Sequence, residues 1–463
     1  MTIGFTRVIK LSRSIHPKVY YSNTVPSHRR LRSRMDEKVK CRENPVLFKL
    51  DSIVFKNIIS PEVKDLKKLF DKYNYEIRIA GGAVRDLLMG EEPKDLDFAT
   101  PATPQQMKEM FTAENVRMIN MTGEKHGTIT PRINDKENFE VTTLRVDVIT
   151  DGRHAEVEFT TDWKLDASRR DLTINSMFLG FDGTIYDYFF GYEDLQKKRV
   201  TFVGDPDVRI KEDYLRIMRY FRFYGRIAEK PDNHEESTLN VMRNNAEGLQ
   251  QVSGERIWME LKKILQGNFA GSLLKIMLNV GVGKYIGLPP EPNIEELERL
   301  LRRAEHLNLY PISFLVALLK NMDEVTMLHN RLRFSGYDRD MAYFLVEHRG
   351  DKDSPLRPML PYEMLVLNSK IKQKDAIEYV REVLKYRGDE MLLEKLNKWE
   401  VPRFPVGGKI LKDKGVPPGK MYGPIINKLK KIWIENEYKD TADDLVKHIP
   451  NILEENLTLK KVK

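Results

Sequence analysis

Residues 78–100 place two glycines and two aspartates in one short stretch, and this stretch restricts the fold more than any other part of the chain. It reads R-I-A-G-G-A-V-R-D-L-L-M-G-E-E-P-K-D-L-D-F-A-T, which predicts a strand, a turn at Gly81-Gly82, a short helix and a second strand. Glycines let a backbone pass close to a polyphosphate, and amides at a helix start point at anionic oxygens. Asp95 and Asp97 are two apart, so on a strand both carboxylates would face the same side.

Paired carboxylates on one face are what a hard cation such as Mg²⁺ requires. A phosphate-binding turn beside them indicates metal-dependent phosphoryl chemistry. A Gly-Gly pair alone fits a tight turn without a ligand equally well. The combination of Gly81-Gly82, a short helix and D-L-D resembles the signature of the DNA-polymerase-β-like nucleotidyltransferases.

Composition narrows the possible partners. A chain of 463 residues predicts two to four domains. No apolar run approaches the about 20 residues of a membrane span, so no membrane partner is expected. The net charge of +8 favours nucleic acid as partner, although a generally basic surface would give the same value. Cys41 is the only cysteine, which excludes disulfides within the chain and a cysteine-rich zinc site.

The first 34 residues contain no acidic residue and combine arginines and serines with scattered apolar side chains. This composition predicts a mitochondrial transit peptide over residues 1–34. The alternative is a disordered basic tail that binds RNA. Met35 follows directly and is a candidate internal start, whose product would lack the leader and remain in the cytoplasm or nucleus.

The following segments predict a mixture of helices and strands. Residues 48–70 predict a lead-in helix with Pro61 in its first turn. Residues 104–111 predict a helix capped by Thr103, and residues 117–133 a hairpin. Further expected elements are a strand over 139–145, a turn between strands over 151–154 and an aromatic-rich hairpin over 180–194.

Two groups of polar residues in these segments are candidates for the site. Glu140 lies in a half-buried strand pattern, and it is either a third carboxylate of the metal site or an exposed strand acid. In the segment R-R-D-L-T-I-N, Arg170, Asp171 and Asn175 would lie near one helical face. Arginine suits a triphosphate, and Asp and Asn suit ribose hydroxyls or local bracing.

Residues 212–223 have a strong helical period. Asp213, Arg216, Arg219 and Arg222 recur every three residues and form one polar stripe, which is either a solvated face or a binding surface. A carboxylate accepts from an exocyclic amino group, and a guanidinium donates to ring acceptors. Cytosine and adenine present that combination, whereas uracil and guanine present a carbonyl beside a ring N–H. An Asp213/Arg216 pair would therefore accept C and A and reject U and G without a nucleic-acid template.

The motifs G-G-A-V-R-D with D-L-D, then R-R-D-L-T-I-N, then E-D-Y-L-R, in this order, resemble the class II tRNA nucleotidyltransferases, the CCA-adding enzymes, of the eukaryotic mitochondrial type. The resemblance implies that Asp95, Asp97 and Glu140 are catalytic and bind Mg²⁺. It also implies a set of nucleotide-binding residues: Gly81, Gly82, Arg85, Arg170, Asp171, Asn175, Asp213, Arg216, Arg219 and Arg222. Ser253–Leu261 resembles a further motif, in which Glu255 and Arg256 are expected to brace a helix rather than touch substrate.

The predicted fold class is α+β, a polymerase-β-like nucleotidyltransferase head followed by an all-helical neck, body and tail. The expected domains are the catalytic head over 48–204, a helical neck with the base-selecting helix over 205–290, a helical body over 291–400 and a basic, tRNA-binding tail over 401–463. Expected helices in the second half are 294–307, 312–321, 341–348, 374–384 and 391–399, and Lys428, Lys430 and Lys431 are expected on a tail helix.

By this resemblance, the tRNA 3′-hydroxyl attacks the α-phosphorus of CTP twice and then of ATP, and pyrophosphate is released each time. Neck, body and tail would hold the acceptor arm and elbow of the tRNA by shape. Two other interpretations remain open, a poly(A) polymerase of the same superfamily and a non-catalytic tRNA-binding protein.

Overall fold

The computed structural model describes residues 39–454 except 120, 152–153, 352–353, 418 and 420. The predicted leader and Met35 lie outside these residues. The chain divides into two compact units, Met1–Cys41 and Arg42–Lys463, and the second contains all the elements below.

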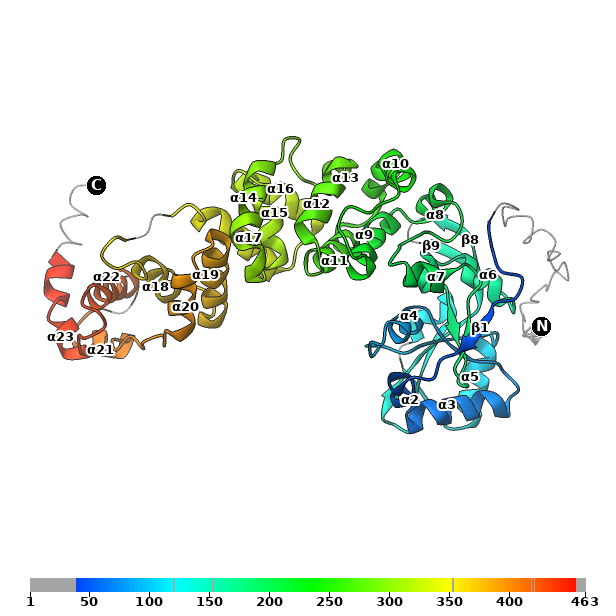
Figure 1. The fold of residues 1–463 in the computed structure, drawn as a ribbon. Coiled ribbons are helices and arrows are strands. Elements are labelled where there is room, and N and C mark those ends of the chain that lie inside the picture. Colours follow the sequence, from blue (N-terminus) through cyan, green and yellow to red (C-terminus); the bar gives the residue numbers. More distant parts are fainter. Residues whose placement is uncertain are drawn as a thin grey trace, which may run out of the picture. The chain divides into compact units, whose positions relative to one another are not determined.

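A mixed sheet forms the centre of the head (Figure 1). Its strands lie in the order β1-β11-β10-β2-β3-β7-β5-β4, with β6 paired to β5. Their bounds are β1 (Val46–Lys49), β2 (Arg78–Ala80), β3 (Asp97–Thr100), β4 (Arg117–Ile119), β5 (Thr128–Ile133), β6 (Glu137–Asn138), β7 (Glu140–Thr143), β10 (Phe178–Leu179) and β11 (Thr184–Tyr186). Among the strands of the described residues, only β3 and β7 pair in parallel, and their register sets Asp97 opposite Glu140. Strands β8 (Arg145–Asp151) and β9 (His154–Phe159) form a separate antiparallel hairpin, which confirms the turn expected near 151–154.

The head helices are α2 (Ile53–Ile58), α3 (Pro61–Lys72), α4 (Gly82–Leu88), α5 (Pro104–Ala113), α6 (Trp163–Ser168) and α7 (Gly191–Gln196), with short 3₁₀ segments η1 (Met121–His126) and η2 (Thr173–Asn175). The Thr103 cap of α5 is confirmed, and Gln106 completes a capping box. The single helix expected over 48–70 is wrong. Its first residues belong to strand β1, and Ser52 and Ser60 each cap a new helix, the second with Pro61 in its first turn.

Three other sequence predictions need correction at the site. Asp95 lies in a bend before β3, and only Asp97 is on the strand. Residues 169–175 are not one helix, because α6 ends at Ser168 and η2 begins at Thr173. Asp213 is not part of the helix that was expected to select the base, because its extended backbone ends the preceding helix.

Apolar side chains of the head strands and helices form one core. Phe98 of β3 packs edge-on against Phe139 at 5.5 Å between ring centroids, and Phe70 of α3 packs against Phe111 of α5 at 6.0 Å. All four rings are almost fully buried. Burial of this kind is the main favourable contribution to folding, and it fixes the strand that carries Asp97.

After β11 the described residues contain no further strand, as expected. The helices of neck and body are α8 (Pro206–Glu212), α9 (Leu215–Ile227), α10 (Glu236–Asn245), α11 (Gly254–Leu265), α12 (Ala270–Asn279), α13 (Val282–Tyr285), α14 (Ile294–Ala304), α15 (Pro311–Ala317), α16 (Met322–Leu332), α17 (Gly336–His348), α18 (Leu360–Leu367), α19 (Gln373–Arg387) and α20 (Glu390–Lys398), with 3₁₀ segments η3 (Ala246–Gln251) and η4 (Glu305–Leu307). The five helices expected over 294–399 are therefore present, although several bounds differ.

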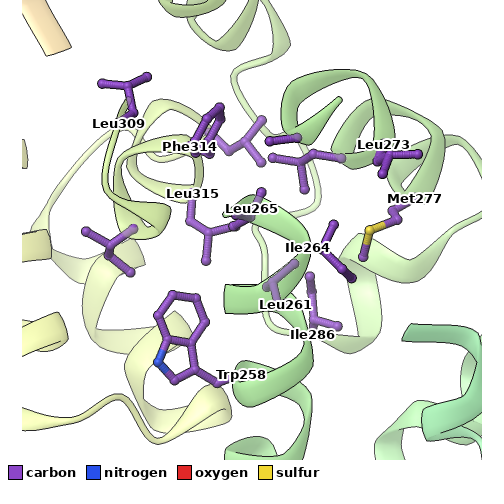
Figure 2. Packing of buried hydrophobic residues seen from close by; sticks show 14 of the residues in the cluster. Trp258, Leu261, Ile264, Leu265, Leu273, Met277, Ile286, Leu309, Phe314 and Leu315 are labelled. Atoms are coloured by element: carbon purple, nitrogen blue, oxygen red, sulfur yellow. The ribbon is translucent and has the colours of Figure 1, made fainter. Parts of the chain in front are cut away.

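Helix α11 lies at the centre of a continuous core that runs from neck to body. Figure 2 shows Trp258, Leu261, Ile264 and Leu265 of α11 among side chains of α12 and α15. These four side chains are buried. The neck and body helices therefore share one core, and α11 is held from several sides.

The tail forms α21 (Gly408–Asp413), α22 (Tyr422–Glu435) and α23 (Ala442–Val446), which surround a separate core that includes Trp433. Lys428, Lys430 and Lys431 lie on α22, as expected, and Lys430 donates to the Leu367 carbonyl at 2.5 Å. None of the helices in the described part of the chain is long and apolar enough to cross a membrane.

The close packing of α11 on α16 predicts a strong effect of one small substitution. A Cβ added at Gly254, the first residue of α11, would lie 1.9 Å from the Arg331 carbonyl oxygen. We expect Gly254→Ala to lower the free energy of unfolding by about 1–3 kcal/mol, because backbone must move to admit the methyl group. Urea denaturation followed by circular dichroism measures this change.

Gly336 offers a matched control, because it also begins a helix and no atom lies within 4 Å of its added Cβ. We expect Gly336→Ala to leave stability unchanged or to raise it by up to about 1 kcal/mol. Equal effects of the two substitutions would contradict the packing described here.

Candidate active site

A large polar cleft lies where the head meets the neck, with a volume of about 1190 Å³. Small-molecule sites usually occupy about 300–1,000 Å³, so this cleft has room for a nucleotide and part of a second substrate. Nine arginines and two lysines line it, against seven acidic residues. This excess of positive charge favours an anionic ligand.

The cleft brings together nearly all the residues predicted from sequence. The following line it: Gly81, Gly82, Arg85, Asp95, Asp97, Arg170, Asp171, Asn175, Asp213, Arg216, Arg219 and Arg222. Glu140 does not line the cleft, although it is exposed and lies in register with Asp97 on the neighbouring strand. Residues separated by more than 130 positions therefore meet in one place.

Gly81 is required for a close approach by a side chain. It has a φ of 66°, and an added Cβ would lie 2.7 Å from Nη1 of Arg170. Its N–H donates to the Met177 carbonyl at 3.0 Å. The Gly81 amide is therefore paired within the protein, whereas the expectation that amides at the helix start point at an anion stays a prediction. Gly81 instead lets the Arg170 guanidinium lie against the backbone.

Arg170 is held in the cleft by several contacts. Its Nη2 lies 3.1 Å from Oδ2 of Asp166, its Nη1 donates to the Asn175 carbonyl at 3.3 Å, and its guanidinium lies 5.0 Å from the Phe178 ring centroid. Asp166 is almost fully buried. Burial alone would raise the pKa of Asp166, but the charges of Arg169 and Arg170 outweigh it and lower the pKa.

Asp171 joins the head to the neck. Its Oδ2 accepts from Nε of Arg219 at 2.6 Å, and its Oδ1 accepts from the Leu172 amide at 2.9 Å and from Asn175 Nδ2 at 3.4 Å. Burial would raise the pKa of Asp171, but the Arg219 and Arg216 charges lower it overall. Asp171 therefore positions Arg219 and Asn175.

Arg85 is buried and already satisfied by protein partners. Its Nε and Nη2 donate to Oδ1 of Asp86 at 2.8 and 2.6 Å, and its Nη1 donates to Oδ1 of Asn175 at 2.5 Å. The guanidinium also lies 4.8 Å from the Phe223 ring centroid of α9. Burial lowers the pKa of Arg85, ahead of the opposing effect of Asp86. These contacts hold the Arg85 side chain in one position in the cleft wall.

The carboxylates lie at the start of β3. Asp97 is exposed as a residue, yet the cleft walls partly desolvate its carboxyl group. This desolvation raises the pKa of Asp97, and the charges of Glu140 and Asp95 raise it further. Negative charge is therefore concentrated locally at these carboxylates, although the Arg170 charge partly offsets it and the cleft as a whole is positive.

Such a donor set fits a hard cation. In the described part of the chain, no three His, Cys, Asp or Glu side chains form a ready-made metal site. Mg²⁺ commonly binds through only one or two carboxylates together with substrate phosphates. Asp95 and Asp97 meet that requirement without a third protein ligand.

Asp213 and Arg216, the expected base-reading pair, are each held in place by other residues of the protein. Asp213 accepts from Nη2 of Arg256 at 2.7 Å and from the Leu215 amide at 3.1 Å. Arg216 donates to Oε2 of Glu212 at 2.6 Å and to the Arg169 carbonyl at 2.9 Å. Both residues line the cleft in fixed orientations, which is what selective recognition of a flat base requires.

Several residues that orient this set were missed in the sequence. Arg256 was expected only to brace a helix, but it lines the cleft and binds Asp213. Glu260, one turn further along α11, binds Nη1 of Arg222 at 2.9 Å. The spacing of four residues between Arg256 and Glu260 was the one signal that both lie on the same helix face.

The chain matches two family models. One, described as "Poly A polymerase head domain", covers residues 77–201, and the other, described as "Probable RNA and SrmB- binding site of polymerase A", covers residues 234–293. The first model therefore includes β2, α4 and β3, and the second includes α11.

The proteins that are similar to this chain in sequence and those that are similar in fold carry names of the same kind. The chain is 50% identical to the mouse protein "CCA tRNA nucleotidyltransferase 1, mitochondrial" over 87% of this chain and 92% of the mouse protein. It is 49% identical to the human protein of the same name over 88% of this chain and 95% of the human protein. The fold is similar to the crystal structure of the Bacillus stearothermophilus CCA-adding enzyme in complex with CTP, with a TM-score of 0.68, 25% identity, and coverage of 89% of this chain and 100% of that one.

The raised pKa of Asp97 predicts a pH-dependent effect on stability. In metal-free buffer at pH 7.5 we expect Asp97→Asn to melt at a higher temperature than the wild type, because it removes a charge that the fold disfavours. The pKa is higher in the folded than in the unfolded state, so the folded state binds more protons and this group destabilises the fold as pH rises. The difference should shrink as pH falls toward 3.8, the ordinary aspartate pKa.

Differential scanning fluorimetry between pH 7.5 and 3.8 measures this effect. An Asp97→Asn protein less stable than the wild type at pH 7.5 would contradict the electrostatics of the site.

Proposed function

Because the chain belongs to the family of CCA tRNA nucleotidyltransferases, we propose that it adds C, C and A to the 3′ end of tRNA from CTP and ATP and releases pyrophosphate at each step. One observation carries the proposal for the site. A single cleft gathers the Asp95/Asp97 carboxylates, the Arg170 guanidinium and the Asp213/Arg216 pair. The carboxylates suit a metal, the arginine a triphosphate and the pair a base.

Asp95 and Asp97 would hold Mg²⁺, with Glu140 next to Asp97 as a further carboxylate. When bound, the metal supplies charge neutralisation and polarisation of the phosphoryl group. Arg170, fixed by Asp166, binds the triphosphate and aligns its α-phosphorus with the tRNA 3′-hydroxyl. Gly81 leaves the space in which that guanidinium lies.

Asp213 and Arg216 select the base. The Asp213 carboxylate accepts from the amino group of cytosine or adenine, and Arg216 donates to the adjacent ring acceptor. Arg256 and Glu212 hold the two side chains in place before a base arrives. Preorganised partners of this kind reduce the entropy cost of recognition.

The remaining residues that were predicted to bind the nucleotide would contact the same CTP or ATP molecule. Arg219 is oriented by Asp171, Arg222 by Glu260, and Arg85 by Asp86 and Asn175. Gly82 lines the wall beside Arg85. Loss of an orienting acid would therefore weaken nucleotide binding through its arginine.

The acceptor arm and elbow of the tRNA would contact the helical neck, body and tail. The lysines of α22 and the Gly/Pro-rich segment before it offer a basic surface for the phosphate backbone. The mammalian relatives are named mitochondrial, which supports a mitochondrial location for this chain and a transit function for its acid-free first 34 residues. A product starting at Met35 would supply the cytoplasm or nucleus.

A primer-extension assay tests the function. Purified protein, Mg²⁺ and a tRNA that ends at the discriminator base receive single nucleotides or CTP with ATP. We expect two additions with CTP alone, three with CTP and ATP, and none with UTP or GTP, because only C and A match the Asp213/Arg216 pair. Denaturing gels count the added residues.

The same gels separate the rival functions. A long ladder with ATP alone would identify a poly(A) polymerase, an activity named in the matching head model. No extension with any nucleotide would favour a tRNA-binding protein without catalysis.

The catalytic role of Asp97 has its own test. We expect Asp97→Asn to lower the addition rate by at least about 10³-fold, because a lost metal ligand removes several kcal/mol of transition-state stabilisation. The dissociation constant for tRNA, measured by gel shift, should stay within about threefold of the wild type, since the neck, body and tail supply most contacts. Retained activity in Asp97→Asn would contradict the assigned role.

A further inference from the structure

Arg145 is a cleft residue with an incomplete set of partners. It is the first residue of β8 and lines the same cleft as Asp97 and Arg170. Its Nη1 donates to the His126 carbonyl, while its Nε is buried and has no hydrogen-bond partner among the residues that the structure describes. A buried donor without a partner is costly, so these protein contacts leave the guanidinium incompletely satisfied.

The charges around Arg145 are unbalanced. The guanidinium makes no ion pair with any residue that the structure describes, whereas Arg169 and Arg170 both bind Asp166 at 2.7 and 3.1 Å. Burial lowers the pKa of Arg145 to about 10, and the neighbouring charge of Arg169 contributes next. The carboxylates of Asp147 and Asp166 oppose this shift, so Arg145 is still protonated at neutral pH. Asp166 is already shared by Arg169 and Arg170, which leaves an excess of positive charge for an anionic ligand to balance.

The sheet holds the backbone of Arg145 in a fixed position. Strand β7 ends two residues earlier, where Thr143 lies opposite Thr100 of β3, the strand that begins with Asp97. The Arg145 amide also donates to Oδ1 of Asp166 at 3.2 Å, so the backbone and the Arg170 side chain share one anchor. A cation in so fixed a place suits a ligand whose position must be reproducible.

We propose that Arg145 binds a phosphate group of the substrate in this cleft, an inference that rests on the proposed nucleotide addition. The phosphate belongs either to the triphosphate of the incoming nucleotide or to the 3′-terminal phosphodiester of the tRNA. Guanidinium donors match phosphate oxygens in geometry as well as charge. Phosphate oxygens would accept from the part of the Arg145 guanidinium that lines the cleft and would compensate the charges of Arg145, Arg169 and Arg170.

The experiment compares wild type, Arg145→Gln and a matched control. Arg132→Gln also removes a strand arginine that donates to a backbone carbonyl, at 2.9 Å to Asp135, but Arg132 lies outside the cleft. For each protein one measures KM for CTP during addition, the dissociation constant for tRNA ending at the discriminator base, and the melting temperature. We expect Arg145→Gln to weaken binding of one substrate by about 10–100-fold and Arg132→Gln to change neither by more than twofold.

The two sources of phosphate give different results. A raised KM for CTP with unchanged tRNA binding assigns Arg145 to the triphosphate. Weakened tRNA binding with unchanged KM for CTP assigns it to the terminal phosphodiester. Values for both substrates within twofold of the wild type would overturn the inference while wild-type addition still supports the proposed function. Absence of addition by the wild type would instead overturn the proposed function.

A folding defect has its own control. If Arg145→Gln melts more than about 5 °C below the wild type, the same binding measurements are made on Arg145→Lys instead. This variant keeps the charge but loses the forked donor. We then expect binding of the same substrate to weaken by at least threefold. Binding within twofold of the wild type by that variant would overturn the proposal.

Discussion

The site depends on an ion pair that crosses from head to neck. Asp171, in the turn before η2, binds Arg219 of α9 at 2.6 Å. A second link runs from Arg216 Nη2 to the Arg169 carbonyl at 2.9 Å. Removal of one partner from a buried pair leaves an uncompensated charge, so these links strongly favour one arrangement of α9 against the phosphate-binding side. In the proposed function, these links set the distance between the residues that would contact the phosphates and those that would contact the base.

This fixed arrangement explains how a protein could choose nucleotides without a template. Helix α11 stabilises this arrangement with two ion pairs, Arg256 to Asp213 and Glu260 to Arg222. The same helix packs Trp258 and Leu261 into the neck and body core (Figure 2). The hydrophobic core therefore orients the polar cleft through a single helix. The head contributes the other half, since β3 carries Asp97 and its parallel neighbour β7 leads directly to Arg145.

The sequence predicted the fold class and most of the cleft residues, because strand and helix periods and the order of the motifs are local signals. It failed where a cap or a turn interrupts a periodic run. Ser60 divides the expected helix over 48–70, and the extended backbone of Asp213 ends α8 before the base-selecting helix begins. It also missed Arg145 and Asp166, whose roles depend on contacts between segments distant in sequence and follow no spacing rule.

The central claim is that protein side chains alone recognise the base. Equilibrium binding of CTP, ATP, UTP and GTP to the full chain in Mg²⁺, without any RNA, tests it most directly, for example by isothermal titration calorimetry. We predict that CTP and ATP bind at least about tenfold more tightly than UTP and GTP, because one well-placed pair of hydrogen bonds discriminates by about 1–3 kcal/mol. Equal affinities for all four nucleotides in the absence of RNA would contradict the claim, because selection would then require the tRNA.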